Sequence, residues 1–257
     1  MRMDINCDMG ESFGAYSLGD DEKMMGLVTS VNIACGYHAG DPGVMAATAA
    51  LAAKYRLAVG AHPGYPDLLG FGRRAMQTFP GEIKNYILYQ VGALCAFLKE
   101  NRLRLQHVKP HGALYNLAAK EERAAHEVIA ALKAYDPELI LVVPAGSLCE
   151  KMAVSAGLRV AGEAFADRAY LASGELAPRT MEGAVIGDPE LVRQRVLSLV
   201  RSGRITSLDG RQIELKAQTL CIHSDTAGAI RLARTVREAL AQAGVDAAPM
   251  GSVLPGL

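Results

Sequence analysis

The sequence predicts an α/β fold in which seven parallel strands form a closed or nearly closed barrel. Short apolar runs alternate with longer stretches rich in alanine and leucine, as parallel β-α units require. This alternation occurs seven times, and no linker, internal repeat or low-complexity tract interrupts it. Ionisable residues lie at the C-terminal ends of the apolar runs, where parallel barrels gather their functional side chains. A doubly wound open sheet is the competing fold.

The elements follow from this alternation. Strands are expected over residues 3–8, 30–35, 57–62, 106–111, 138–144, 158–165 and 218–223. Helices are expected over residues 20–28, 43–55, 80–101, 120–134, 146–156, 188–202 and 227–243. Asp41 stands directly before Pro42, which places a capping residue before a proline at the first helical position. Pro80 is expected to open its helix in a similar way.

Two segments depart from the β-α pattern. Residues 204–216 read RITSLDGRQIELK, two alternating runs around Asp-Gly, which predicts an inserted β-hairpin. Residues 166–187 carry Gly and Pro without clear periodicity, which is typical of a functional loop or lid. We therefore predict one (β/α) barrel domain over residues 1–257 with an inserted hairpin near 204–216.

Composition limits the function classes. Half of the 257 residues are hydrophobic, and Lys+Arg and Asp+Glu both number 27. Without a basic surplus, neither nucleic acid nor an anionic membrane is an expected partner. The five cysteines are dispersed and form no C-x-x-C pair, which favours a reducing compartment. No apolar signal segment or membrane span is present, so we expect a cytoplasmic protein.

Polar residues share faces at the strand ends, because residues two apart in a strand point to the same side. Asp4, Asn6 and Asp8 form such a set, with Asp4 the deepest and expected to be structural. Further sets come from the other strands: His107, Lys109 and His111; Glu163 and Asp167; His223 and Asp225; and His62 at the end of its strand. Five separate segments therefore deliver ionisable groups to one mouth, a clustering typical of catalytic sites.

Several motif readings fail. His107 and His111 have the i, i+4 spacing of zinc ligands on a helix, but Pro110 favours extended geometry, which holds the two about 13 Å apart. We assign no metal ligands, although a metal held by Asp8, His62 and one more histidine remains open. The stretch GYHAGDPG (36–43) could hold an anion at a helix N-terminus.

Six stretches of this sequence resemble the LamB/YcsF family, and together they span positions 4 to 226. They are DINCDMGESFG (4–14), VNIACGYHAGDP (31–42), GAHPGYPDLLGFGRR (60–74), HVKPHGALYN (107–116), EAFADRAY (163–170) and IHSDT (222–226). Ser224 departs from the pattern, where glycine is expected.

The resemblance implies a TIM-like (β/α) barrel of the glycoside hydrolase/deacetylase type, usually with seven strands. It also implies the A subunit of an ATP-dependent 5-oxoprolinase, which opens 5-oxo-L-proline to L-glutamate. ATP would be the co-substrate, with Mg²⁺, and subunits B and C would be the partners.

From the chemistry of lactam opening we assign hypothetical roles to the polar residues at the strand ends. Lys109 and His111 would stabilise a phosphoryl group or oxyanion, and Asp8, aided by His62, would act as general base or as a magnesium-side carboxylate. Arg73 or Arg74 would hold a carboxylate or phosphate. Residues expected to bind or orient substrate or nucleotide are Asn6, Asn32, His38, Asp41, Glu163, Asp167 and His223.

Two other functions stay open from sequence alone. The same Asp and His inventory suits a metal-dependent amide hydrolase or deacetylase. The chain could also be a non-catalytic carrier that delivers 5-oxoproline or a related small acid to its partners.

Overall fold

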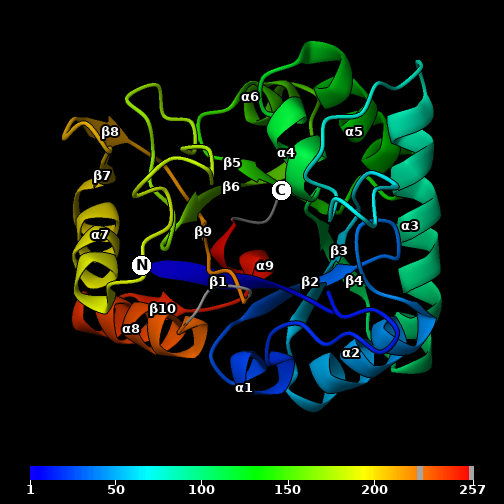
Figure 1. Ribbon diagram of the computed structural model, residues 1–257, viewed down its shortest axis with the longest axis horizontal. Helices are drawn as coiled ribbons and strands as arrows, with labels where there is room; N and C mark the ends of the chain where they lie inside the picture. The colour runs from blue at the N-terminus through cyan, green and yellow to red at the C-terminus, as the bar shows by residue number, and fades with distance from the viewer. Residues whose placement is uncertain (225–227, 255–257) are drawn as a thin grey trace.

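Seven parallel strands close a barrel in the part of the chain that the computed structural model describes, residues 1–224 and 228–254 (Figure 1). The barrel strands are β1 (Arg2–Met9), β2 (Ser30–Ala34), β3 (Ala58–His62), β4 (Leu105–Val108), β5 (Ile140–Pro144), β6 (Arg159–Phe165) and β9 (Thr219–Cys221). β1 pairs with β2 on one side and with β9 on the other, so the sheet has closed on itself. The predicted barrel is confirmed over the open sheet, and each of the seven predicted strands is present.

Helices surround the barrel and cover the outer faces of its strands (Figure 1). They are α1 (Asp21–Met25), α2 (Pro42–Lys54), α3 (Glu82–Glu100), α5 (Glu122–Tyr135), α6 (Leu148–Ser155), α7 (Pro189–Ser202) and α8 (Ala229–Gln242). Outward strand residues such as Ile5 and Leu141 join helix residues such as Leu94 and Val236 in one buried apolar cluster. Within the described residues, no helix combines the length and apolarity needed to cross a membrane.

The two predicted helix starts had different outcomes. Asp41 caps α2 and Pro42 is its first residue, as predicted. The expectation for Pro80 was wrong, because α3 begins at Glu82. Gly81 stands between them with φ +88°, a left-handed conformation that breaks the helix before it reaches Pro80.

Three short elements were not predicted: α4 (Gly112–Ala118), β10 (Asp246–Ala247) and α9 (Met250–Val253). β10 adds to β1 outside the barrel, with Arg2 opposite Asp246. Met250 of α9 packs on Ile140, Val142 and Ala161, near the start of β5 and β6. α9 therefore closes the amino end of the barrel and leaves the carboxyl end for the site.

Two insertions rise beside the carboxyl end of the barrel. β7 (Arg204–Thr206) and β8 (Gln212–Glu214) pair antiparallel as a hairpin next to α7 (Figure 1). The segment 166–187 contains isolated bridges between Arg168 and Val185 and between Tyr170 and Leu176. It is a long loop without helix, and several of its residues face the cavity described below.

The barrel interior is polar on several strands. Asp4, Asn6 and Asp8 of β1 point inward together, as their two-residue spacing predicted. Gly60 of β3 leaves the space that the His107 ring of β4 fills, and a Cβ on Gly60 would lie 2.1 Å from that ring. The inward faces therefore deliver buried polar groups along the barrel axis rather than a wholly apolar core.

Candidate functional site

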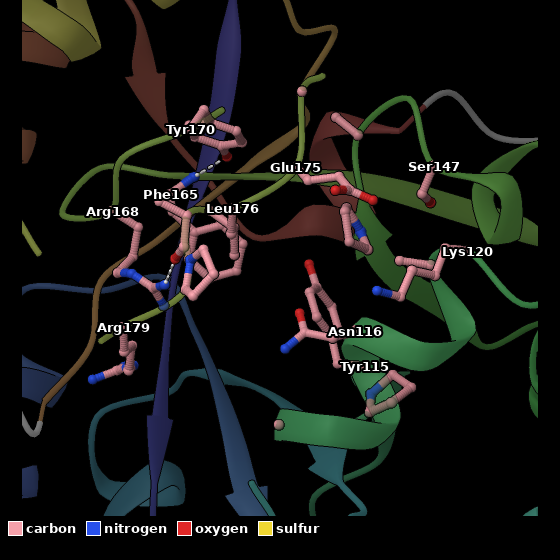
Figure 2. Close-up of a pocket in the computed structure, with 18 of the residues that line it drawn as sticks. Tyr115, Asn116, Lys120, Ser147, Phe165, Arg168, Tyr170, Glu175, Leu176 and Arg179 are labelled. Atoms are coloured by element: carbon pink, nitrogen blue, oxygen red, sulfur yellow. Dashed lines mark hydrogen bonds between the residues drawn. The ribbon is translucent and has the colours of Figure 1, made fainter. Parts of the chain in front are cut away.

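A cavity of about 1090 Å³ opens at the carboxyl ends of the strands. Arg168 and Arg179 lie on one side of it, Lys120 and Ser147 lie on the other, and Tyr115 projects between them (Figure 2). The predicted site residues Asp8, His62, Arg73, Lys109, His111 and His223 also line it. The structure thus brings side chains from β1, β3, the segment after β4, and the loop after β6 to one mouth.

Lys109 is the charge at the floor of this cavity. Its side chain is 3% exposed, and its Nζ lies 3.0 Å from Asp8 Oδ1 and 3.0 Å from Glu163 Oε1. It also contacts Asn6 Oδ1 at 3.3 Å and Cys221 Sγ at 3.2 Å. Burial opposes its charge, but the neighbouring anions, Asp8 foremost, hold its pKa well above the usual value. Lys109 is therefore a cation fixed between two buried carboxylates.

Two asparagines hold these carboxylates in place. Asn6 Nδ2 donates to Glu163 Oε1 at 2.8 Å and to Thr219 Oγ1 at 2.6 Å. Asn32 Nδ2 donates to Asp8 Oδ1 at 2.8 Å and to Asn6 Oδ1 at 2.7 Å. Both asparagines were predicted to bind substrate or nucleotide, and neither lines the cavity. Their contacts in the described residues are to the barrel network, so they position the groups that do face it.

His107 and Tyr115 extend the same network. His107 Nε2 donates to Asn32 Oδ1 at 2.7 Å, and burial lowers the His107 pKa to about 3. The ring is therefore neutral at physiological pH. Tyr115 donates its hydroxyl to Glu163 Oε2 at 2.6 Å. His107 is thus a supporting residue one step below Lys109, and Tyr115 is a cavity residue that sequence reasoning did not single out.

A histidine cluster, defined here as Glu11, His38, His62 and His111, lies beside Asp8 at the edge of the cavity. The rings of His38 and His111 stack at 3.6 Å between centroids. His62 Nε2 lies 3.2 Å from Asp8 Oδ2 and 2.9 Å from His111 Nδ1. Although burial raises it, His62 and Lys109 hold the Asp8 pKa well below its usual value. Asp8 is therefore an anion shared by Lys109 and the histidine cluster.

Gly72 allows the loop after β3 to cover this cluster. Its φ is +65°, and a Cβ there would lie 2.7 Å from the Cβ of His38 and 2.8 Å from the His111 ring. The His111 Nε2 atom donates to the backbone oxygen of Phe71 at 2.8 Å. Glu11, in the segment after β1, was not predicted, because nothing in a non-repeating stretch after a strand indicates where its carboxylate points.

Asp167 and His223 form a separate pair, of which His223 lines the cavity. His223 Nδ1 lies 3.0 Å from Asp167 Oδ2, and the His223 backbone N–H donates to the same oxygen. Burial raises the Asp167 pKa, but His223 outweighs it and the pKa is lowered. The His223 ring stacks on Phe165. Asp225, the other residue predicted on this face, lies outside the described residues.

Asp41 and Arg74, which were predicted to bind substrate or nucleotide, are engaged away from the cavity. Asp41 accepts backbone N–H groups from Gly43 and Val44 at Oδ1 and from Gly14 at Oδ2, so its carboxylate serves the start of α2. It also occupies the helix N-terminus where GYHAGDPG was expected to hold an anion.

Of the two neighbouring arginines, Arg74 pairs with Asp67, whose Oδ1 accepts from Arg74 Nε at 2.8 Å. Arg73 is the one that lines the cavity.

Arg168 and Arg179 enlarge the cationic wall beyond the sequence prediction. Arg168 donates to the backbone oxygens of Ala177 and Ala184, which fixes it inside the 166–187 loop. Burial, and then the nearby charge of Arg179, lowers the Arg168 pKa. Ser224, the departure from the family pattern, donates its hydroxyl to the Asp8 backbone oxygen at 3.0 Å. It therefore ties the segment after β9 to the end of β1.

Comparison with known proteins agrees with this architecture. The LamB/YcsF family model matches residues 3–255. A protein from Syntrophobacter fumaroxidans, named as the A subunit of 5-oxoprolinase, is 65% identical over 252 residues, which cover 98% of this chain and 100% of that protein.

Two solved structures are similar in fold. The lactam utilization protein from Thermus thermophilus superposes with a TM-score of 0.91 at 51% identity and covers 96% of this chain and 99% of its own. A family 4 carbohydrate esterase from Streptomyces lividans superposes with a TM-score of 0.51 at 12% identity, covering 96% of this chain and 91% of its own. The second likeness concerns the fold alone.

Proposed function

The chain belongs to the LamB/YcsF family, and from this premise we propose that it is the A subunit of an ATP-dependent 5-oxoprolinase. The reaction is the opening of 5-oxo-L-proline to L-glutamate, coupled to hydrolysis of ATP to ADP and phosphate. The observation that carries the proposal is the 65% identity, over the full length of that protein, to a relative with this name. Subunits B and C are its proposed partners, and the cytoplasm is its proposed compartment.

The cavity supports lactam opening on physical grounds. A lactam is an unreactive amide, so its oxygen needs a cation or a phosphoryl group before the ring carbon accepts a nucleophile. Lys109 supplies a fixed positive charge at the cavity floor, in a buried site where charge acts strongly. We propose that it stabilises the developing oxyanion or the phosphoryl oxygens.

Asp8 is the proposed general base. It lies beside Lys109, its side chain is partly open to the cavity, and its low pKa keeps it ionised. An ionised carboxylate at that position can accept a proton from an attacking water. We propose that His62, whose Nε2 lies 3.2 Å from Asp8 Oδ2, aids this base.

His111 fits its predicted role less well than Lys109. Burial, and then the charge of His62, holds the His111 pKa well below its usual value, so the ring is neutral. A neutral imidazole has one N–H, and that of His111 is given to the Phe71 backbone oxygen. His111 therefore has no proton to donate to an oxyanion, and Lys109 is assigned that role without it.

The arginines suit the acidic parts of the reactants. Arg73, Arg168 and Arg179 face one cavity, and guanidinium groups bind carboxylates and phosphates by paired hydrogen bonds. We propose that Arg73 holds the carboxylate of 5-oxoproline or a phosphate of ATP, which would enter with Mg²⁺.

Reconstitution with candidate partner subunits tests the proposal. Glutamate and ADP formed from 5-oxoproline and ATP are measured for the wild type and for Asp8→Asn and Lys109→Met. We expect turnover with the wild type and none with either variant. Lys133→Met, on the exposed surface of α5, is the matched control and should retain full turnover. Absence of glutamate with folded partners would overturn the assignment.

Near-normal turnover in either site variant would overturn the assigned role. A non-catalytic carrier would bind 5-oxoproline and support turnover that is indifferent to Asp8 and Lys109.

A further inference from the structure

The histidine cluster contains a contact between two ring nitrogens that needs a positive species, either a proton or a metal ion, between them. Its four potential ligand atoms, one each from Glu11, His38, His62 and His111, lie within 4.8 Å of one another. All four residues are buried and come from separate segments of the chain. Buried polar groups gather in this way only when something satisfies them.

Backbone carbonyls fix the proton positions on two of the rings. His62 Nδ1 lies 2.7 Å from the backbone oxygen of Lys109, and His111 Nε2 lies 2.8 Å from the backbone oxygen of Phe71. A carbonyl oxygen only accepts, so each of these nitrogens carries the proton. If both rings are neutral, the remaining nitrogens, His62 Nε2 and His111 Nδ1, have only lone pairs, and they face each other at 2.9 Å.

Two facing lone pairs repel unless a positive species lies with them. A proton bound between the two nitrogens is one solution, and it is the outcome that an absence of metal binding would indicate. A bound cation is the other solution. Metal-binding histidines almost always donate their second N–H to a carbonyl or carboxylate, the arrangement seen at both His62 and His111.

His38 and Glu11 complete the ligand set. His38 Nε2 lies 3.3 Å from Glu11 Oε1, and His38 Nδ1 has no hydrogen-bond partner among residues 1–224 and 228–254. The same Glu11 oxygen is 3.7 Å from His111 Nδ1. His38 is fully buried, and a buried ring nitrogen without a hydrogen-bond partner is uncommon in folded proteins.

We propose that Glu11, His38, His62 and His111 bind one divalent first-row transition metal ion of the zinc class. Three imidazole nitrogens and a carboxylate are typical ligands for such ions, whereas Mg²⁺ prefers an all-oxygen shell. Tetrahedral ligands at about 2.0–2.2 Å from one ion lie about 3.3–3.6 Å from one another, and three separations in the cluster are 2.9, 3.3 and 3.7 Å. Asp8 Oδ2, 3.2 Å from His62 Nε2, lies next to this site.

The ion would lie at the edge of the cavity, since Glu11, His62 and His111 are among its lining residues. This inference rests on the cluster geometry and not on the proposed 5-oxoprolinase activity. If that activity is present, the bound ion would supply Lewis-acid chemistry beside Lys109.

Cobalt titration tests the site without any turnover assay. Tag-free full-length protein is stripped with a chelator and titrated with Co²⁺, whose visible absorption reports a low-coordinate nitrogen and oxygen shell. We expect one equivalent bound and displacement by Zn²⁺. His38→Asn and Glu11→Gln should each weaken Co²⁺ binding by at least about 10–100-fold, the range that even outer-shell changes cause. His126→Ala, an exposed histidine on α5, should bind like the wild type.

Three results would overturn the proposal. The first is the absence of stoichiometric Co²⁺ binding by the wild type. The second is unchanged binding in both ligand variants. The third is loss of binding in His223→Ala with retention in His38→Asn, which would place the ion at the alternative group Asp8, Cys221 and His223. Circular dichroism establishes that each variant is folded, and Glu11→Gln decides the matter if His38→Asn is not.

Discussion

Replacing Lys109 by methionine should destabilise the fold as well as remove the charge that we propose to be catalytic. Two carboxylate oxygens lie 3.0 Å from its Nζ, one on Asp8 and one on Glu163. At an effective dielectric constant of about 20, each such pair is attractive by about 5 kcal/mol. Desolvation of the buried ions offsets much of this, but removing only the cation leaves two buried carboxylates uncompensated. Breaking a buried pair in this way typically costs about 3–5 kcal/mol.

Unfolding in urea and by heat measures this effect. A loss of about 3–5 kcal/mol corresponds to a fall in Tm of about 6–20 °C for a chain of this size. Glu163→Gln in the Lys109→Met background removes one uncompensated charge and should restore part of the loss, whereas Lys133→Met should change stability little. A loss below about 1 kcal/mol, or no recovery in the double variant, would refute the idea that Lys109 neutralises the barrel interior.

Two further predictions concern the barrel interior. Burial raises the Asp4 pKa to about 6, so the folded protein keeps a proton between about pH 4 and 6 that the unfolded chain releases. The contribution of this group to the free energy of unfolding therefore falls by on the order of 3 kcal/mol as pH rises through that window. Asp4→Asn should remove this part of the pH dependence. Urea unfolding at about pH 4 and at about pH 7 measures it. An identical slope in the variant would contradict it. Gly60→Ala should lower the free energy of unfolding by about 1–3 kcal/mol or more, because the added Cβ would lie 2.1 Å from the His107 ring. Gly92→Ala, which adds a Cβ in open space on α3, should raise it by about 0.5–1 kcal/mol. Equal thermal shifts in the two glycine variants would contradict the steric argument.

The strands and their inward faces could be predicted from sequence because both depend on local rules. Asp4, Asn6 and Asp8 share a face through the two-residue period of a strand, whatever the rest of the chain does. α4 was missed because it is only seven residues long and begins at Gly112, two residues after Pro110, where Pro and Gly indicate a turn. Short helices depend on tertiary packing rather than on propensity, so their sequence signal is weak.

The residues that form the site were harder to predict, because they are brought together by contacts between segments distant in sequence. Arg73 and Arg74 are neighbours of the same type, and only the position of Asp67 shows that Arg74 is engaged outside the cavity. Glu11 and Arg168 lie in irregular segments where no periodicity assigns a direction to the side chain. Asp41 illustrates the reverse case, since its capping position before Pro42 was readable and accounts for its carboxylate.

The position of the Lys109 charge depends on closure of the barrel itself. Its contacts come from β1, through Asn6 and Asp8, from β6, through Glu163, and from β9, through Cys221. β9 is the strand that joins β6 to β1, so these acceptors meet only when the first and last barrel strands pair. An unclosed sheet would leave Lys109 without its carboxylates and Asp8 without its cation. Closure of the barrel therefore assembles the contacts that compensate the Lys109 charge, which explains why a polar interior is tolerated at the centre of this fold.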